Sequence, residues 1–163
     1  MRVDLANVTL ELMPCRAAWW RAERALLVAD LHLGKDAHFA CAGRPMPVGD
    51  AGPTGRTLAV LDEALAASGA ERLIVLGDLF HAGGPGYHAA IEALVAWRAR
   101  RQTLALTLVR GNHDVRAGDP ACELGFECVD EPWAMGGTAG VGGAGGLALR
   151  HTEFHPDAGP ESS

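Results

Sequence analysis

The stretch Ala25-Leu-Leu-Val-Ala29, followed at once by Asp30-Leu-His32, decides how the rest of the chain is interpreted. A compact apolar run of this kind is typical of a strand that is buried on both faces of a sheet. A carboxylate and an imidazole follow where the expected strand ends. In an extended segment, residues two apart project to the same side, so we expect Asp30 and His32 to face one cation together.

Two further apolar runs lead into polar residues in the same way. The run Arg72–Leu76 leads into Gly77-Asp78, and the run Leu104–Val109 leads into Gly111-Asn-His-Asp114. In open α/β sheets, ligands bind beyond the carboxyl ends of the strands. We therefore expect the polar residues of all three motifs to meet at one edge of a sheet.

Helices are expected between the apolar runs. Thr54 can cap a helix that carries leucines at helical spacing and ends near Gly69. A second helix is expected around Ile91–Val95, reaching about Arg101. This alternation of strands and helices predicts an α/β fold with a largely parallel sheet.

The outer parts of the chain carry weaker patterns. Val3–Leu12 alternates partially, which predicts an edge strand, and Ala18–Trp20 is its candidate hairpin partner. Phe126–Val129 and Leu147–Arg150 are candidates for short strands.

Length and composition fit one globular domain. The chain has 163 residues, of which 48% are hydrophobic and 21% charged. We expect a single domain over residues 1–163, with a glycine-rich loop at 136–146 and a disordered tail at 156–163. The formal charge of −6 argues against a protein that binds nucleic acid by bulk electrostatics.

The sequence also indicates where the protein works. The N-terminus lacks the apolar stretch of a signal peptide, and no run approaches the roughly 20 apolar residues that span a bilayer. The 4 cysteines form no C-x-x-C pair, so we interpret them as reduced thiols. We therefore expect a cytoplasmic protein without a membrane partner.

The polar motifs suit a pair of metal ions. Asp78 follows a glycine, so the backbone can turn sharply there, and its two oxygens could bridge cations about 3.5–4 Å apart. Asn112 can offer a neutral amide oxygen, and His113 beside it can point elsewhere as a proton donor. This set of oxygen and nitrogen donors suits Mn²⁺, Fe or Zn²⁺. Each motif alone is commonly a turn, a cap or a solvated loop, but chance convergence of all three is far less expected.

The first three signature blocks of the calcineurin-like metallophosphoesterase superfamily resemble three motifs of this chain, Asp30-Leu-His32, Gly77-Asp78 and Gly111-Asn-His-Asp114. Leu27–Lys35 and Val75–His81 are similar to one branch of it. That branch comprises bacterial phosphoesterases encoded beside a DNA ligase and a helicase, described as ligase-associated DNA-damage-response endonucleases. The similarity covers roughly Leu5–Val129. It implies a sandwich of largely parallel or mixed β-sheets flanked by helices.

The resemblance also implies a set of metal ligands. Asp30 and His32 would bind the first metal, and Asp78 would bridge both. Asn112 would bind the second metal. His151 is similar to a histidine that follows a later strand and also binds the second metal. The implied cofactors are two divalent ions, Mn²⁺ by preference, with Fe or Zn²⁺ as alternatives.

Two further residues receive a catalytic role from the resemblance. His113 would act as the general acid near the leaving oxygen, and Asp114 would orient its ring. Outside these motifs, His81 follows Asp78 by three residues and could contact the substrate at the rim of the cleft.

One block of the family pattern is missing. Family members finish with a Gly-His-x-His block, and nothing after His151 contains it. We therefore expect a truncated or altered C-terminus, with weaker binding of the first metal. His155 is a candidate substitute for one missing histidine, although an exposed tail position is the simpler interpretation.

Three functions stay open at this point. The first is a phosphodiesterase or endonuclease that acts on DNA in a repair context, in functional association with a DNA ligase and a helicase. The second is a phosphoesterase of small molecules such as nucleotides. The third is a catalytically impaired phosphoesterase-like domain that has kept only a binding role.

Overall fold

The computed structural model describes residues 1–5, 8–34, 52–81, 86–135 and 146–151, without the side chains of residues 113, 116 and 117. The expected glycine-rich loop lies outside the described residues apart from position 146, and the expected tail and His155 lie wholly outside them. Among the described residues, Cys15, Cys122 and Cys128 form no disulfide. Within the described residues, no helix is both long and apolar enough to cross a membrane.

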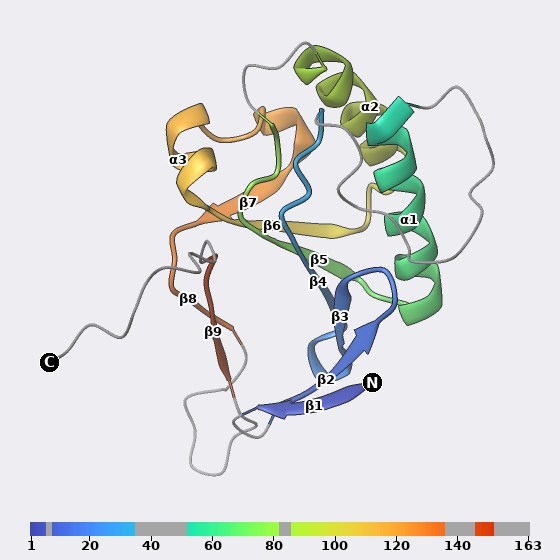
Figure 1. Ribbon diagram of the computed structural model, residues 1–163, viewed down its shortest axis with the longest axis vertical. Coiled ribbons are helices and arrows are strands. Elements are labelled where there is room, and N and C mark those ends of the chain that lie inside the picture. The colour runs from blue at the N-terminus through green and yellow to red at the C-terminus, as the bar shows by residue number, and fades with distance from the viewer. Residues whose placement is uncertain (6–7, 35–51, 82–85, 136–145, 152–163) are drawn as a thin grey trace, which may run out of the picture.

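A mixed seven-stranded sheet forms the centre of the fold (Figure 1). Its strands lie side by side in chain order: β1 Arg2–Leu5, β2 Val8–Met13, β3 Ala17–Trp20, β4 Ala25–Ala29, β5 Arg72–Leu76, β6 Ala105–Val109 and β7 Phe126–Val129. Strands β1 to β4 pair antiparallel, and β4 to β7 pair parallel. The predicted α/β fold with a mixed sheet is confirmed.

The parallel half of the sheet brings three strand ends level. Ala29 lies opposite Leu76, and Leu76 lies opposite Val109. Because these neighbours are the last residues of their strands, the segments that follow them leave the sheet at the same edge. This register places the three polar motifs together.

Helices cover one face of the sheet. The helix α1 spans Gly52–Ser68 and α2 spans Tyr87–Ala99, and Figure 1 shows both on the same side. Their apolar stripes pack on the strands in one buried cluster. We expected Thr54 to cap α1, but Thr54 lies inside the helix. The helix starts earlier because Pro53 fits the first turn, where no N–H donor is needed.

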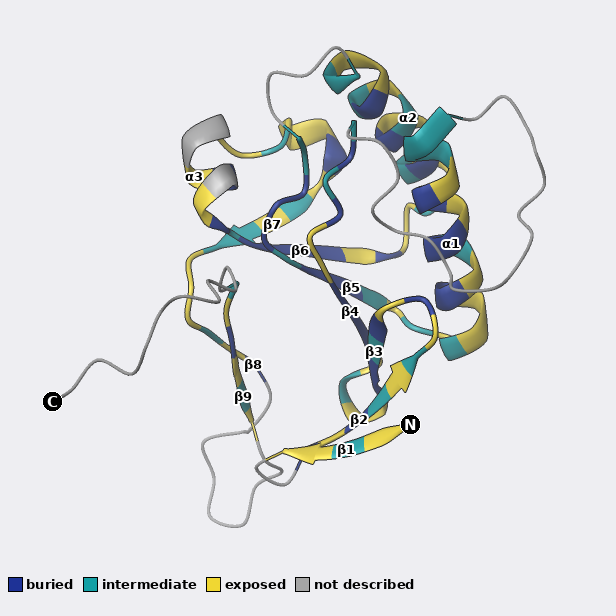
Figure 2. Cartoon of the chain, viewed as in Figure 1, coloured by how far each residue is buried: buried dark blue, intermediate teal, exposed yellow. Residues whose placement is uncertain are grey.

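A small second sheet covers the other face. Its two strands, β8 Trp133–Met135 and β9 Leu147–Leu149, pair antiparallel. Met135 and Leu149 are buried against strands of the large sheet. Figure 2 accordingly shows mostly buried residues in β4, β5 and β6, which lie between the helices and this ribbon.

Three shorter helices complete the described elements, and one expected strand needs correction. The elements η1 Arg21–Glu23, α3 Asn112–Ala117 and η2 Cys122–Leu124 are all single turns or little more. The expected single edge strand over Val3–Leu12 is wrong. It is a hairpin of β1 and β2 in which Leu5 pairs with Val8, so both strands keep a partner for their backbone N–H and C=O groups.

Candidate metal centre

The segment after β4 is not extended, which corrects our expectation for it. Asp30 has φ 50° and His32 has φ 41°, both in the left-handed region. The segment turns because it pairs with the one after β5: the His32 N–H donates to the Asp78 carbonyl over 2.8 Å. Left-handed backbone at residues with a side chain is held at a cost of about 1–3 kcal/mol, and such positions cluster at functional sites.

The turn after β5 has the sharp geometry that the glycine predicted. Gly77 has φ 67° and Asp78 has φ 49°. The buried carboxylate of Asp114 holds this turn, accepting hydrogen bonds from the N–H groups of Asp78 over 2.6 Å and Leu79 over 3.1 Å. It also accepts one from the N–H of Gly111 over 2.9 Å. Hydrogen bonds to an ionised acceptor are the stronger kind, so Asp114 fixes two strand ends against each other.

Asp114 is therefore a positioning residue for the Asp78 turn. We had expected it to orient the ring of His113, whose side chain lies outside the description. Sequence reasoning missed the observed role because the N–H donors of Asp78 and Leu79 lie 36 and 35 residues away along the chain. No local pattern reports a contact over such a separation.

Three of the predicted ligands form a compact cluster. Asp30, Asp78 and His151 each offer one ligand atom, and these atoms lie within 4.8 Å of one another. The His151 Nε2 atom lies 2.9 Å from Asp30 Oδ1 and 3.9 Å from Asp78 Oδ2. Metal-bound nitrogen and oxygen atoms lie about 2.0–2.2 Å from the ion, so donors separated by such distances can share one cation.

Asp78 provides the observation that points to a cation. Its side chain is only 4% exposed, and its Oδ1 atom is buried without a hydrogen-bond donor among the described residues. A buried charged acceptor without a partner is strongly unfavourable. A divalent cation at the cluster would supply that partner, so the residues present fit a metal site.

Two more predicted histidines lie beside the cluster. The His32 Nε2 atom lies 3.7 Å from Asp78 Oδ2, and its side chain is 20% exposed. The ring of His81 lies beside that of His32, with the two centroids 6.3 Å apart. The structure thus brings His32 to the carboxylates and His81 next to His32.

Two glycines make room for the His151 ring. A Cβ atom on Gly77 would overlap that ring, and one on Gly111 would lie 2.8 Å from both His151 Nδ1 and Asp78 Oδ1. A glycine directly before the polar residue, as in Gly77-Asp78 and Gly111-Asn112, is a sequence signal for such a close approach. Asn112 follows Gly111 directly, so it begins α3 next to the cluster, with its side chain exposed.

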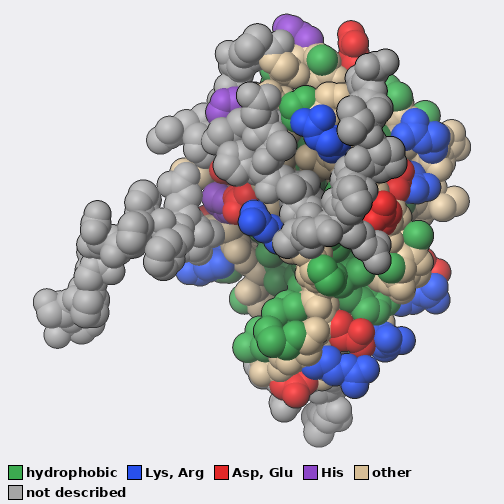
Figure 3. Space-filling model, turned by 45° about the vertical axis from the view of Figure 1, so that its right-hand side comes forward, with side chains coloured by type: hydrophobic (Ala, Val, Ile, Leu, Met, Phe, Trp, Pro, Cys, Tyr) green, Lys and Arg blue, Asp and Glu red, His purple; other side chains and the backbone are tan. Residues whose placement is uncertain are grey.

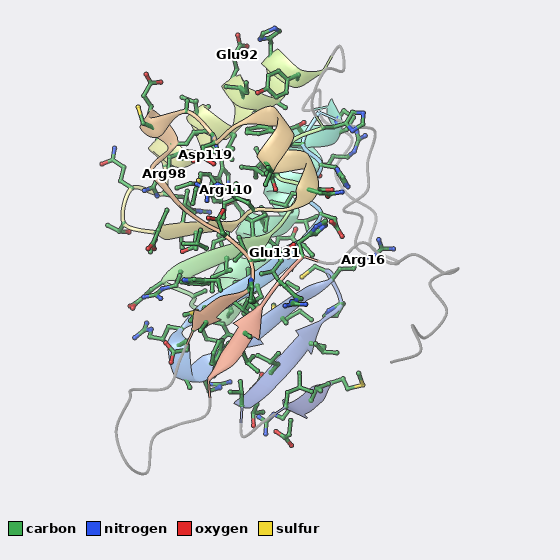
Figure 4. The ribbon with its side chains drawn as sticks, turned by 90° about the vertical axis from the view of Figure 1, so that its left-hand side faces the viewer. Arg16, Glu92, Arg98, Arg110, Asp119 and Glu131 are labelled. Atoms are coloured by element: carbon green, nitrogen blue, oxygen red, sulfur yellow. The ribbon has the colours of Figure 1, made fainter. Side chains whose placement is uncertain are left out.

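An ion-pair network holds the segment that precedes Gly111. Arg110 contacts both oxygens of Asp119 at 2.6 and 2.8 Å and Asp130 at 2.7 Å. Figure 4 shows the labelled Arg110 and Asp119 close together. The hydrogen bond from the guanidinium of Arg110 lowers the pKa of the Asp119 carboxyl, and burial raises the pKa of the nearby Cys128 thiol.

Comparisons with known proteins agree with this geometry. Residues 23–150 match the family model described as calcineurin-like phosphoesterase. The crystal structure of Pseudomonas putida nuclease MPE is similar, with 39% sequence identity and a TM-score of 0.68, over 82% of this chain and 60% of that chain. The match therefore spans less than two thirds of the nuclease. No sequence of a curated protein matches significantly. Since the family match covers most of its length, this chain belongs to the calcineurin-like phosphoesterase family.

Proposed function

We propose that this chain is a nuclease that hydrolyses phosphodiester bonds of DNA with two divalent metal ions. The cluster of Asp30, Asp78 and His151 carries the proposal, together with the buried Oδ1 atom of Asp78, which has no donor among the described residues. Membership of a phosphoesterase family supports the reaction type. The similarity to a protein described as a nuclease supports a nucleic acid as the substrate, and the resemblance to the ligase-associated branch favours DNA.

The ligand assignment follows the resemblance of the three motifs to the family. Asp30 and His32 would hold the first ion, Asp78 would contact both, and Asn112 and His151 would hold the second. The contact of 2.9 Å between His151 and Asp30 supports a compact site, in which ligands of both ions are neighbours. Oxygen and nitrogen donors suit Mn²⁺, with Fe or Zn²⁺ as alternatives.

The chemistry divides between the ions and the chain. Bound divalent ions supply a water of lowered pKa and neutralise the charge that develops on the phosphate. The Asp114 carboxylate keeps the Asp78 turn in place, so that little reorganisation is needed during the reaction. His113, in the first turn of α3, donates a proton to the leaving oxygen. His81 contacts the substrate phosphate from the rim.

The surface charge leaves substrate binding to the site itself. Lys and Arg side chains lie interspersed with Asp and Glu over the face drawn in Figure 3. With a formal charge of −6, the chain gains little from bulk attraction of DNA. Binding would therefore depend on local positive charge from the ions.

The proposal is tested by assaying single-stranded DNA and bis-p-nitrophenyl phosphate with added Mn²⁺, and again with a chelator. Cleavage of DNA that stops with the chelator is the expected result. Cleavage of the small ester alone would favour a small-molecule phosphoesterase. Failure to cleave either, together with weak uptake of Mn²⁺, would leave a binding role and overturn the proposal. The variant Val95→Ala, at an exposed position on α2, is the matched control and should behave as wild type.

A finer proposal concerns the setting of the reaction. The similarity of Leu27–Lys35 and Val75–His81 to the ligase-associated branch supports a role in cytoplasmic DNA repair, beside a DNA ligase and a helicase. DNA ends processed by this chain should then be sealed by a bacterial DNA ligase. A gel assay that finds no ligatable ends among the products would contradict the repair role while leaving nuclease activity intact.

A further inference from the structure

A cavity opens at the same edge of the sheet as the metal cluster. Its volume is about 240 Å³, and it lies between the segment after β5, the first turns of α2 and the segment after α3. The residues that matter for its chemistry are Phe80, Tyr87, Ile91, Asp114, Asp119 and Pro120. The proposed hydrolysis does not use this cavity.

We propose that this cavity binds a nucleobase of the substrate, next to the phosphodiester that is cut. The inference rests on the proposed nuclease function and names a part of its substrate. Four properties of the cavity carry it: its position, its size, its aromatic wall and its charge.

The cavity adjoins the metal cluster through two residues. Phe80 follows Asp78 by two positions, and a chain advances at most about 3.6 Å per residue, so the two backbones lie within about 7 Å. Asp114 lines the cavity and also holds the Asp78 turn through its carboxylate. A base and the phosphate of the same nucleotide can therefore reach the cavity and the cluster together.

The size and the wall suit a flat aromatic ring. Pockets for drug-sized ligands measure about 300–1,000 Å³, so this smaller cavity takes a base rather than a whole nucleotide. The rings of Phe80 and Tyr87 meet edge to face, with centroids 5.6 Å apart and planes at 74°. Both residues are half-buried, so part of this aromatic surface is open to the cavity. Bases stack on such side chains without regard to sequence.

The acidic residues of the lining favour a base over a phosphate. Asp114 and Asp119 are among the lining residues, and within the part of the chain that the structure describes no Lys or Arg is. The guanidinium of Arg110 lowers the pKa of Asp119, so that carboxylate stays ionised near neutral pH. Ionised carboxylates only accept hydrogen bonds, and an oxygen that accepts one from Arg110 or from a backbone N–H group, such as Asp114 Oδ1, keeps a further lone pair. The exocyclic amino group of a base such as cytosine is therefore favoured over a phosphate.

The experiment compares two esters with the same leaving group. One is the p-nitrophenyl ester of deoxycytidine 5′-phosphate, and the other is methyl p-nitrophenyl phosphate, which has no base. Wild type should show a lower KM for the nucleoside ester. In Tyr87→Ala the ratio of the two KM values should shrink by about 5- to 150-fold, as expected for loss of one stacking contact. Tyr87→Phe should keep the ratio, because the ring remains.

A binding measurement separates this inference from the proposed function. Saturation-transfer NMR of deoxycytidine with the full chain, without metal, should show transfer to the base protons in wild type and Tyr87→Phe. The transfer should disappear in Tyr87→Ala and persist in Val95→Ala, which lies on the same helix outside the cavity. Base binding without hydrolysis of either ester would keep the cavity assignment and overturn the nuclease function. Hydrolysis with an unchanged KM ratio and equal transfer in Tyr87→Ala would overturn the cavity assignment alone.

Discussion

The two ends of strands β4, β5 and β6 carry charged residues in opposite arrangements. At the amino ends, Arg24 pairs with Glu71 at 2.8 Å, and these side chains are 60% and 66% exposed. At the carboxyl ends, Asp78 is buried, and one of its oxygens has no donor among the described residues. Left-handed backbone occurs at both ends, at Arg24 with φ 50° as well as at Asp30, His32 and Asp78. The same apolar strands thus end in an exposed ion pair on one side and in a buried, incompletely paired carboxylate on the other.

The two strand ends therefore differ in what their charged residues contribute to stability. Exposed ion pairs contribute about 0–1 kcal/mol. A buried carboxylate with one oxygen that lacks a donor lowers the stability of the metal-free protein, and it persists only where the surrounding structure holds it. At the carboxyl end, the buried Asp78 carboxylate lowers the stability of the metal-free protein but is available to a cation. The exposed pair at the amino end has no such cost. Substitutions at the two ends should therefore differ in kind as well as in size.

The largest effect is expected from Asp78→Asn. Affinity for Mn²⁺ should fall by more than about 100-fold, because a bridging carboxylate is lost. The free energy of unfolding without metal should rise by about 1 kcal/mol, because a buried charge with one unpartnered oxygen is removed. Calorimetric titration and urea denaturation measure the two quantities. Retained affinity for Mn²⁺ would contradict the bridging role of Asp78. A fall in the metal-free stability would show that its buried carboxylate does not destabilise the fold.

Next in size is the pair Gly77→Ala and Gly69→Ala, which places one substitution at each end of β5. Both glycines have φ 67°, so both variants bear a similar backbone strain. A Cβ on Gly69 meets nothing, whereas one on Gly77 overlaps the His151 ring. Overpacking should therefore destabilise Gly77→Ala by a further 1–3 kcal/mol or so, and only this variant should lose metal affinity. Thermal unfolding with and without Mn²⁺ checks this, and equal losses in the two variants would exclude steric conflict with His151.

A smaller effect is expected from Asp114→Asn. The amide keeps one acceptor oxygen where the carboxylate used two, so at least one backbone N–H of the Asp78 turn loses its partner. Stability should fall by about 1–3 kcal/mol, and metal affinity should fall by about 10- to 100-fold, as for other residues that orient ligands. Titration with Mn²⁺ measures the second quantity. Unchanged affinity in the folded variant would show that the turn does not need Asp114.

At the amino end, breaking the pair of Arg24 and Glu71 should change little. The double-mutant cycle of Arg24→Ala and Glu71→Ala should give a coupling of at most about 1 kcal/mol, since both side chains are exposed. Metal affinity should stay that of wild type. A coupling energy well above this value, or a loss of Mn²⁺ binding, would erase the contrast between the two ends.

The smallest effect concerns pH at the carboxyl end. The pKa of Asp119 is lower in the folded protein than its ordinary value, so the pair with Arg110 stabilises the fold above that value, about 3.9. This contribution is lost as the pH falls through the folded pKa. Asp119→Asn should therefore unfold with a shallower pH dependence below about pH 4, measured by circular dichroism. An identical pH dependence in wild type and variant would show that the pair of Arg110 and Asp119 does not stabilise the fold.

The parallel half of the sheet could be predicted because its signals are local. Each apolar run became the strand that it indicated, and the level strand ends brought Asp30, Asp78 and the Gly111 segment together. The strand β8 was missed because Trp133–Met135 is too short for an alternating pattern to appear. Its partner β9, which was expected, positions His151 by packing across the core.

Other parts of the site could not be predicted because they depend on distant contacts. The left-handed backbone at Asp30 and His32 has no signature in residues that carry side chains. It arises from pairing with the segment after β5, at Leu33 and Phe80. The role of Asp114 likewise depends on backbone donors in another part of the chain. Residue types therefore predicted which side chains gather at the site, but not how they are held.

Anomalous diffraction from crystals of the full chain grown with Mn²⁺ tests the central claim most directly. We expect anomalous peaks within ligand distance of Asp30, Asp78 and His151, with the Oδ1 atom of Asp78 bound to an ion. Crystals of Asp78→Asn grown in the same way should lack these peaks. A wild-type map without a peak at this cluster, or with Mn²⁺ bound only elsewhere, would contradict the account.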